Sequence, residues 1–219
     1  MERYNPLIDK FPTRYKNVEL NTDFRVALEI FRIQSDPSKD DTTKKLEALN
    51  KLYKFEIHLD DPADLVEFAW SGLEWFLKGG DGHFINIIEK DEDEEKNNED
   101  DEESNVKKGD NEDFPLDYDF DSSRIYTAFL RSYGINLIEI EYMHYFDFLY
   151  RLQDIDDECA LSRVMGFRTE TLNGKKGKER SALRKMKKLY EIPYEINEED
   201  RERLRDIGID DEDLSLFMQ

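Results

Sequence analysis

Tyr133-Gly134-Ile135-Asn136-Leu137, followed after five residues by Met143-His144-Tyr145-Phe146-Asp147-Phe148, decides how this chain folds. The glycine predicts the end of a helix, because glycine readily adopts the left-handed conformation that closes many helices. Asn136 predicts the start of a second helix, which we expect to extend to about residue 152. Its apolar side chains gather in one broad arc of a helical wheel and predict the buried centre of a helical domain: Ile138, Tyr142, Tyr145, Phe146, Leu149 and Leu152.

These two segments, and Thr22-Asp23-Phe24-Arg25 far upstream, carry a resemblance to a known family. They resemble bacteriophage proteins of the Gp-fifteen type (gene product fifteen), which are encoded among the tail genes of long-tailed phages and prophages of Gram-positive bacteria. The resemblance covers a small part of the chain, in the order that the family has. It implies a role in tail assembly and not an enzymatic one.

Composition narrows the class of protein. The 219 residues suffice for one compact domain or two small ones, and the formal charge of −21 disfavours non-specific binding of the whole chain to nucleic acid or anionic membranes. The aromatic share of 12% indicates that the chain can form a core despite its 39% of charged residues. We see no secretory signal and no run of the roughly 20 apolar residues that span a bilayer, so we expect a soluble protein.

The N-terminal half, residues 1–88, is predicted to hold an extended arm and three helices. Residues 1–21 form the arm or a short strand, and Thr22 or Asp23 caps a helix to about residue 34. A second helix is expected from about residue 40 to residue 55. Asp61 and Pro62 predict the cap and first residue of a third helix, which ends at Gly79-Gly80.

Residues 89–115 differ in composition from the rest. Between residues 89 and 113 there are 14 acidic and 4 basic side chains, a net charge of −10, and one apolar side chain, Val106. Such a segment cannot bury enough apolar surface to offset its ordering entropy, so we expect a disordered acidic linker. An acidic docking strip or a nucleic-acid mimic is the alternative.

The C-terminal half, residues 116–219, is predicted to be helical as well. Asp119 or Asp121 caps the helix that ends at Gly134, and a short helix begins near Asp156. A turn at Asn173-Gly174 precedes a basic helix, and a capped piece from Asn197 leads to an acidic tail. The fold is therefore predicted as all-α, a helical bundle in two halves joined by the acidic linker.

His144 is the titratable residue of the aromatic segment. Glu141-x-x-His144 has the spacing that di-iron helical bundles use, but such a site needs a second motif of this kind, and the sequence has none. Three roles stay open: a structural histidine bonded to a neighbouring element, a contact for a partner, and a metal ligand.

Motifs for catalysis are missing from the sequence. We find no nucleophile elbow and no phosphate-binding glycine loop, and Cys159 follows three acids that would discourage a reactive thiolate. We therefore expect a protein without enzymatic activity, cofactor or metal, and Cys159 as a small buried residue.

The segment from Arg163 to Lys188 is basic, with 10 basic and 2 acidic residues and a net charge of +8. It includes four cations at helical spacings beside Leu183 and Met186: Arg180, Arg184, Lys187 and Lys188. Three interpretations compete: a charged face that relieves repulsion within an acidic protein, a docking site for an acidic or amphipathic helix, and a nucleic-acid contact.

The resemblance implies a chaperone that coats the long, helix-rich tape-measure protein until tail-tube subunits polymerise around it. It would act in the cytoplasm of the bacterial host, with the tape-measure protein or other tail proteins as partners and self-association left open. A structural tail or neck adaptor and a regulatory nucleic-acid-binding protein are the alternatives. The candidate partner-binding residues are Tyr142, His144, Tyr145, Phe146, Phe148, Arg184, Lys187 and Lys188.

Overall fold

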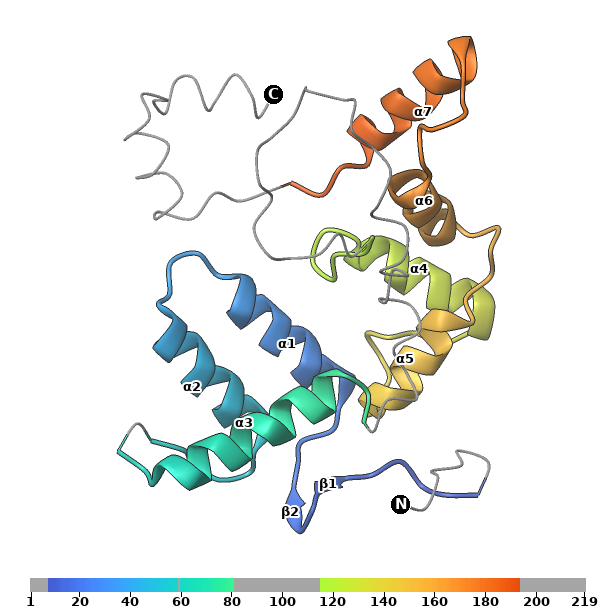
Figure 1. Ribbon diagram of the computed structural model, residues 1–219. Helices are drawn as coiled ribbons and strands as arrows, with labels where there is room; N and C mark the ends of the chain where they lie inside the picture. The colour runs from blue at the N-terminus through green and yellow to red at the C-terminus, as the bar shows by residue number, and fades with distance from the viewer. Residues whose placement is uncertain (1–7, 59, 81–114, 194–219) are drawn as a thin grey trace, which may run out of the picture.

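The computed structural model describes residues 8–58, 60–80 and 115–193, and these residues form seven helices and one short hairpin (Figure 1). The predicted all-α fold is confirmed. The hairpin pairs β1 (Arg14–Tyr15) with antiparallel β2 (Val18–Glu19), at the place where the sequence predicted an arm or short strand. Lys16, in the turn between the strands, has a φ of 52°.

Helices α1 (Phe24–Ser35) and α2 (Asp41–Leu52) pack against each other and begin as predicted. The Asp23 carboxylate accepts a hydrogen bond from the Arg25 amide at 2.9 Å, and Asp40 caps α2 in the same way. The predicted end of α2 at residue 55 is wrong by three residues. Tyr53 takes an extended conformation there and forms a bridge with Leu20 next to the hairpin.

Helix α3 (Ala63–Leu77) begins one residue later than predicted. Pro62 is its N-cap and not its first residue, and the Asp61 carboxylate accepts from the His58 amide instead of capping the helix. The predicted glycine stop is confirmed, since Gly79 and Gly80 both have positive φ angles, 76° and 95°.

Helix α4 (Ser122–Tyr133) ends at Gly134, which is left-handed with a φ of 67°. The predicted helix over residues 136–152 is wrong in its first half, because α5 comprises Tyr145–Gln153. Residues 136–140 form a turn whose carbonyl oxygens are held by another part of the chain. The Arg25 guanidinium donates to the carbonyls of Leu137 and Ile140 at 3.0 and 2.6 Å.

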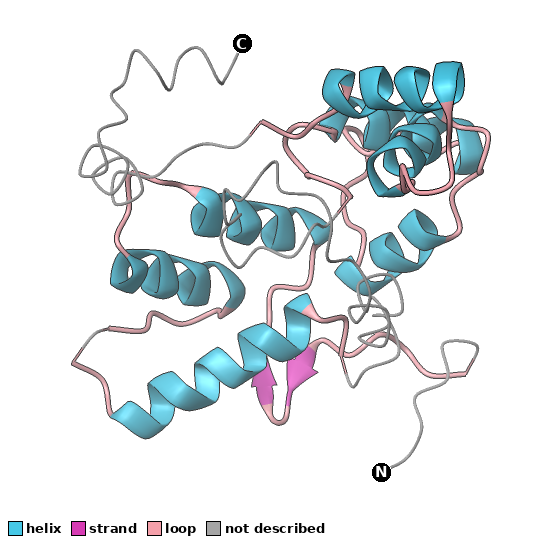
Figure 2. Cartoon of the chain, turned by 45° about the horizontal axis from the view of Figure 1, so that its top comes forward, coloured by secondary structure: helices cyan, strands magenta, loops and turns pink. Residues whose placement is uncertain are grey.

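Helices α6 (Ala160–Thr169) and α7 (Gly177–Leu189) complete the described fold, and α7 packs on α6 at the end of the molecule farthest from the hairpin (Figures 1 and 2). Cys159 is buried and caps α6, since its Sγ accepts from the Ser162 amide. Gly174, with a φ of 77°, forms the predicted turn before α7. The predicted piece from Asn197 and the acidic tail lie outside the described residues.

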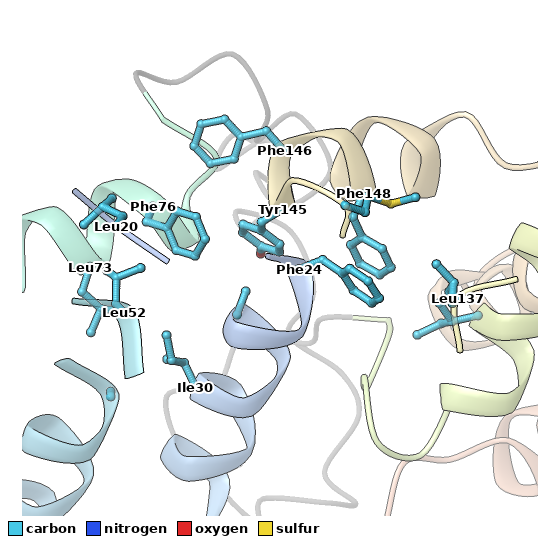
Figure 3. Packing of buried hydrophobic residues seen from close by; sticks show 14 of the residues in the cluster. Leu20, Phe24, Ile30, Leu52, Leu73, Phe76, Leu137, Tyr145, Phe146 and Phe148 are labelled. Carbon is cyan, nitrogen blue, oxygen red and sulfur yellow. The ribbon is translucent and has the colours of Figure 1, made fainter. Parts of the chain in front are cut away.

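One hydrophobic cluster joins residues from both sides of the predicted linker. Figure 3 shows Phe24 and Phe76 from the N-terminal side packed near Tyr145 and Phe148 from the C-terminal side. The backbone joins them as well, because the amide of Phe24 donates to the carbonyl of Met143 at 2.9 Å. The two predicted halves therefore share a core, whereas the predicted linker, apart from Pro115, lies outside the described residues.

Candidate partner-binding surface

The aromatic candidates of the 142–148 segment are mostly buried. The side chains of Tyr145, Phe146 and Phe148 are at most 1% exposed, and His144 is 6% exposed. Tyr142 alone among these five is open to solvent, at 53%. The structure places this segment in the core (Figure 3), so a partner can reach Tyr142 and the turn that precedes it, but not the three rings that follow.

Phe148 explains why this helix is so aromatic. Its ring stacks on Phe24 of α1 and on Phe129 of α4, with centroid distances of 4.9 and 5.0 Å and an interplanar angle of 12° in both pairs. Tyr145 packs in the same layer against Phe76 of α3 at 5.1 Å. Burial raises the pKa of Tyr145 well above its ordinary value, so its hydroxyl stays neutral and donates to the carbonyl of Leu77.

His144 is the N-cap of α5, so its side chain has a structural role in the folded chain. Its Nδ1 accepts from the amide of Phe146 at 3.0 Å, and its Nε2–H donates to the carbonyl of Pro12 at 3.0 Å. The ring also stacks on Phe11 at 5.0 Å. Burial lowers the pKa of His144, although the bond to Pro12 and the charge of Asp147 act in the opposite direction.

The Glu141-x-x-His144 spacing does not lie on one helix. Glu141 belongs to the turn before α5, and His144 begins the helix, so the two side chains are not one helical turn apart on a shared face. Among the described residues, no group of three or more His, Cys, Asp or Glu side chains could hold a metal ion. No helix in these ranges has the length and apolar composition to cross a bilayer.

Helix α7 carries the three basic candidates and is the most open of the described helices. It buries one side chain, Leu183, and leaves Met186 and Leu189 exposed at 37% and 66%. Arg184 and Lys188 are exposed, whereas Lys187 is half-buried and donates to the carbonyl of Arg168 at 2.6 Å. Lys187 therefore positions α7, and the other two cations face solvent.

The position of α7 depends on a buried ion pair that the sequence did not predict. Asp121 is the N-cap residue of α4, as predicted, but its side chain makes no capping bond to the helix. Its fully buried carboxylate instead accepts from the Arg168 guanidinium at 2.6 and 3.0 Å and from Arg124 at 2.7 Å. The same guanidinium donates to the carbonyls of Tyr190, at the end of α7, and of Pro115. In the sequence Arg168 is one arginine among many, next to an aromatic residue, and nothing there distinguished it as a partner of Asp121.

Comparison with known proteins agrees with this arrangement of helices. The model of the family described as "Bacteriophage Gp15 protein" matches residues 5–192, a range that includes every helix and strand described above. The chain belongs to this family. Searches of curated proteins and of solved structures found no match.

Membership in the Bacteriophage Gp15 protein family confirms the resemblance seen in the sequence. It supports a bacteriophage protein with a structural or assembly role, whose partners are other phage proteins. The match includes α7 and ends at residue 192, so the open helix lies within the part of the chain that the Gp15 family shares.

Proposed function

We propose that this Gp15-family protein is a non-enzymatic chaperone of phage tail assembly, which binds the tape-measure protein in the cytoplasm of the bacterial host. The family match over residues 5–192 carries this proposal, because it supports an assembly or structural role. The resemblance noted in the sequence adds the setting of tail genes, in which a long helical protein must be kept soluble until the tail tube surrounds it.

Two physical features support the choice of a chaperone. A protein that holds amphipathic helices needs accessible apolar side chains, and α7 exposes Met186 and Leu189 beside several cations. The net charge of −21 would keep a complex with an aggregation-prone partner in solution through repulsion between complexes.

Co-expression with the tape-measure protein encoded in the same tail-gene cluster tests the proposal. We expect the tape-measure protein to be recovered in the soluble fraction as a complex with this chain, and to aggregate when it is expressed alone. The matched control is an unrelated acidic protein of similar size expressed at the same level.

Absence of a complex would contradict the chaperone function. If this chain were then found at stoichiometric levels in purified phage particles, the structural tail or neck adaptor would be the better assignment. Salt-dependent binding of DNA or RNA without a tail partner would favour the regulatory alternative.

A further inference from the structure

The exposed side of α7 has an apolar stripe. Ala182, Met186 and Leu189 follow one another at spacings of four and three residues, which places them on one side of the helix. All three are exposed, whereas Leu183, which borders Met186 on the helix surface, is buried and fixes the helix to the rest of the fold. A surface helix normally turns its apolar stripe toward the core. Here an apolar stripe faces solvent.

Cations border this stripe. Lys178 and Lys185 lie next to it on the helix surface, and Arg184 and Lys188 follow farther around. All four are exposed, and within the described residues their side chains make no hydrogen bond or ion pair. The single acid of α7, Glu179, is paired with Lys175 at 2.9 Å. The open face of α7 is therefore apolar along its centre and positively charged at its edge.

The rest of the fold holds α7 from behind and leaves this face open. Lys187 donates to the carbonyl of Arg168, and Arg168 donates to the carbonyl of Tyr190 at 2.6 Å, so that both bonds join α7 to α6. The ring of Tyr190 stacks on Phe167 with an interplanar angle of 5°. None of these contacts uses the stripe, so binding on the stripe would not disturb the attachment of α7.

We propose that the face formed by Ala182, Met186 and Leu189 with Lys178, Lys185 and Lys188 is the docking surface for an acidic amphipathic helix of a phage partner. This inference rests on the proposed function and specifies the chemistry of the partner. The apolar stripe would be covered by leucine-type side chains at helical spacing, and the bordering cations would pair with glutamates or aspartates on the partner.

Charge complementarity favours a protein helix over nucleic acid. Nucleic acid would pair with the lysines but would leave Met186 and Leu189 uncovered, and the charge of −21 would repel its phosphates. An acidic helix with an apolar face satisfies the stripe and the cations together.

Fluorescence anisotropy of the full chain with a synthetic peptide tests this surface. The probe is a fluorescein-labelled peptide of about 21 residues made of Glu, Ala and Leu, with Leu at the a and d positions of each heptad and Ala between the Glu residues to favour a helix. A peptide of the same composition in scrambled order is the control for the apolar stripe. We expect the heptad peptide to bind more tightly than the scrambled one, and its affinity to fall as salt is raised.

Two double variants separate the stripe from its cations. Met186→Asp with Leu189→Asp, and Lys185→Glu with Lys188→Glu, should each weaken binding by roughly ten-fold or more, as loss of central contacts does. Ile8→Asp is the matched control for the first pair, since Ile8 is 81% exposed in the N-terminal arm. Lys44→Glu on α2 is the control for the second. Both controls should bind like wild type, and circular dichroism melts show whether each variant is folded.

Three results would overturn the inference. The first is equal binding by the folded α7 variants, and the second is preferred binding of a DNA oligonucleotide that ignores the Met186 and Leu189 changes. The third is peptide binding that occurs only after residues 210–219 are deleted, which would assign the face to the acidic end of the chain itself.

The two proposals fail in different ways. If an α7 variant that no longer binds the peptide still keeps the tape-measure protein soluble, the docking surface is wrong and the chaperone function stands. If the wild-type chain does not keep that protein soluble, the chaperone function fails whatever the peptide does.

Discussion

The imidazole of His144 donates a hydrogen bond to the carbonyl of Pro12, 132 residues earlier in the chain, at a distance of 3.0 Å. The other ring nitrogen accepts from the amide of Phe146, so one side chain caps α5 and holds the N-terminal arm. Phe11 stacks on the same ring, meets the ring of Phe146 edge-on and lies tilted against the ring of Tyr150. His144 is thus the point where the arm joins the core.

Replacement of His144 by Ala should destabilise the protein by roughly 1–3 kcal/mol, because it removes a helix cap and leaves the carbonyl of Pro12 without its donor. Urea unfolding followed by circular dichroism measures the change. His144→Asn is the matched control, since Asn is a good N-cap and should recover part of the loss. A His144→Ala variant as stable as wild type would contradict this structural role.

Acidification should destabilise the protein through the same residue. Burial lowers the pKa of His144 in the folded state below its ordinary value of 6.5, so the unfolded chain binds more protons. His144 contributes its full share to the stability of the folded state above the pKa that it has in the unfolded chain. That share is lost as the pH falls below this value. Protonation of Nδ1 would also remove the acceptor for the amide of Phe146.

The measurement compares the free energy of unfolding at about pH 7.5 and about pH 5.5, on either side of the ordinary histidine pKa. Wild type should lose more stability than His144→Asn over this interval. Equal losses in both proteins would show that other groups cause the pH dependence.

Arg168→Met should destabilise the protein by about 3 kcal/mol, because it leaves the buried carboxylate of Asp121 with Arg124 as its one charged partner among the described residues. The variant should also loosen the end of α7, since Arg168 holds the carbonyl of Tyr190. A double-mutant cycle with Asp121→Asn isolates the interaction between the two side chains. Hydrogen exchange of the α7 amides tests the second effect, and unchanged protection there would contradict it.

Phe148→Ala should cost about 3–5 kcal/mol, as expected for a large-to-small change in a closed core. The side chain is 0% exposed and stacks on rings from two other helices. Tyr142→Ala is the matched control, because Tyr142 is half open and loses one bond to Thr22. If Phe148→Ala abolished partner binding while the melting temperature stayed the same, Phe148 would be a contact residue after all.

The sequence predicted those parts of the fold that depend on neighbouring residues. Asp23 and Gly134 act on the helix ends next to them, and their roles were predicted correctly. The helix predicted from residue 136 failed because Arg25, more than 110 residues away, takes the carbonyls of the turn. The same error placed His144 inside a helix, one turn after Glu141, whereas His144 is the N-cap of α5 and is buried.

The open face of α7 could not be predicted either, because it depends on contacts between helices and not on neighbouring residues in the sequence. Leu183, Met186 and Leu189 have similar apolar side chains at a spacing of three residues, and the sequence alone does not say which of them packs inward. Contact with α6 decides it, since Leu183 is 6% exposed and Leu189 is 66% exposed. The basic helix was therefore predictable, but its open face was not.

Gly72 lies where α3 approaches Tyr15 of the hairpin and the neighbouring Tyr53, and this close approach requires a residue without a side chain. A Cβ atom at this position would lie 2.2 Å from the hydroxyl of Tyr53 and 2.7 Å from the ring of Tyr15. The Tyr53 hydroxyl is fixed by its bond to the carbonyl of Ala69 at 3.0 Å, so it cannot move away without losing that bond. Gly72→Ala should therefore destabilise the protein by about 1–3 kcal/mol.

Gly166→Ala is the matched control within a helix. Gly166 lies in α6, and a Cβ there would meet nothing within 4 Å, so alanine should stabilise the helix by about 0.5–1 kcal/mol. Thermal unfolding of both variants gives the two signs directly. If both substitutions raised the melting temperature, α3 would have room for a side chain at Gly72, and the close packing of the hairpin on that helix would be wrong.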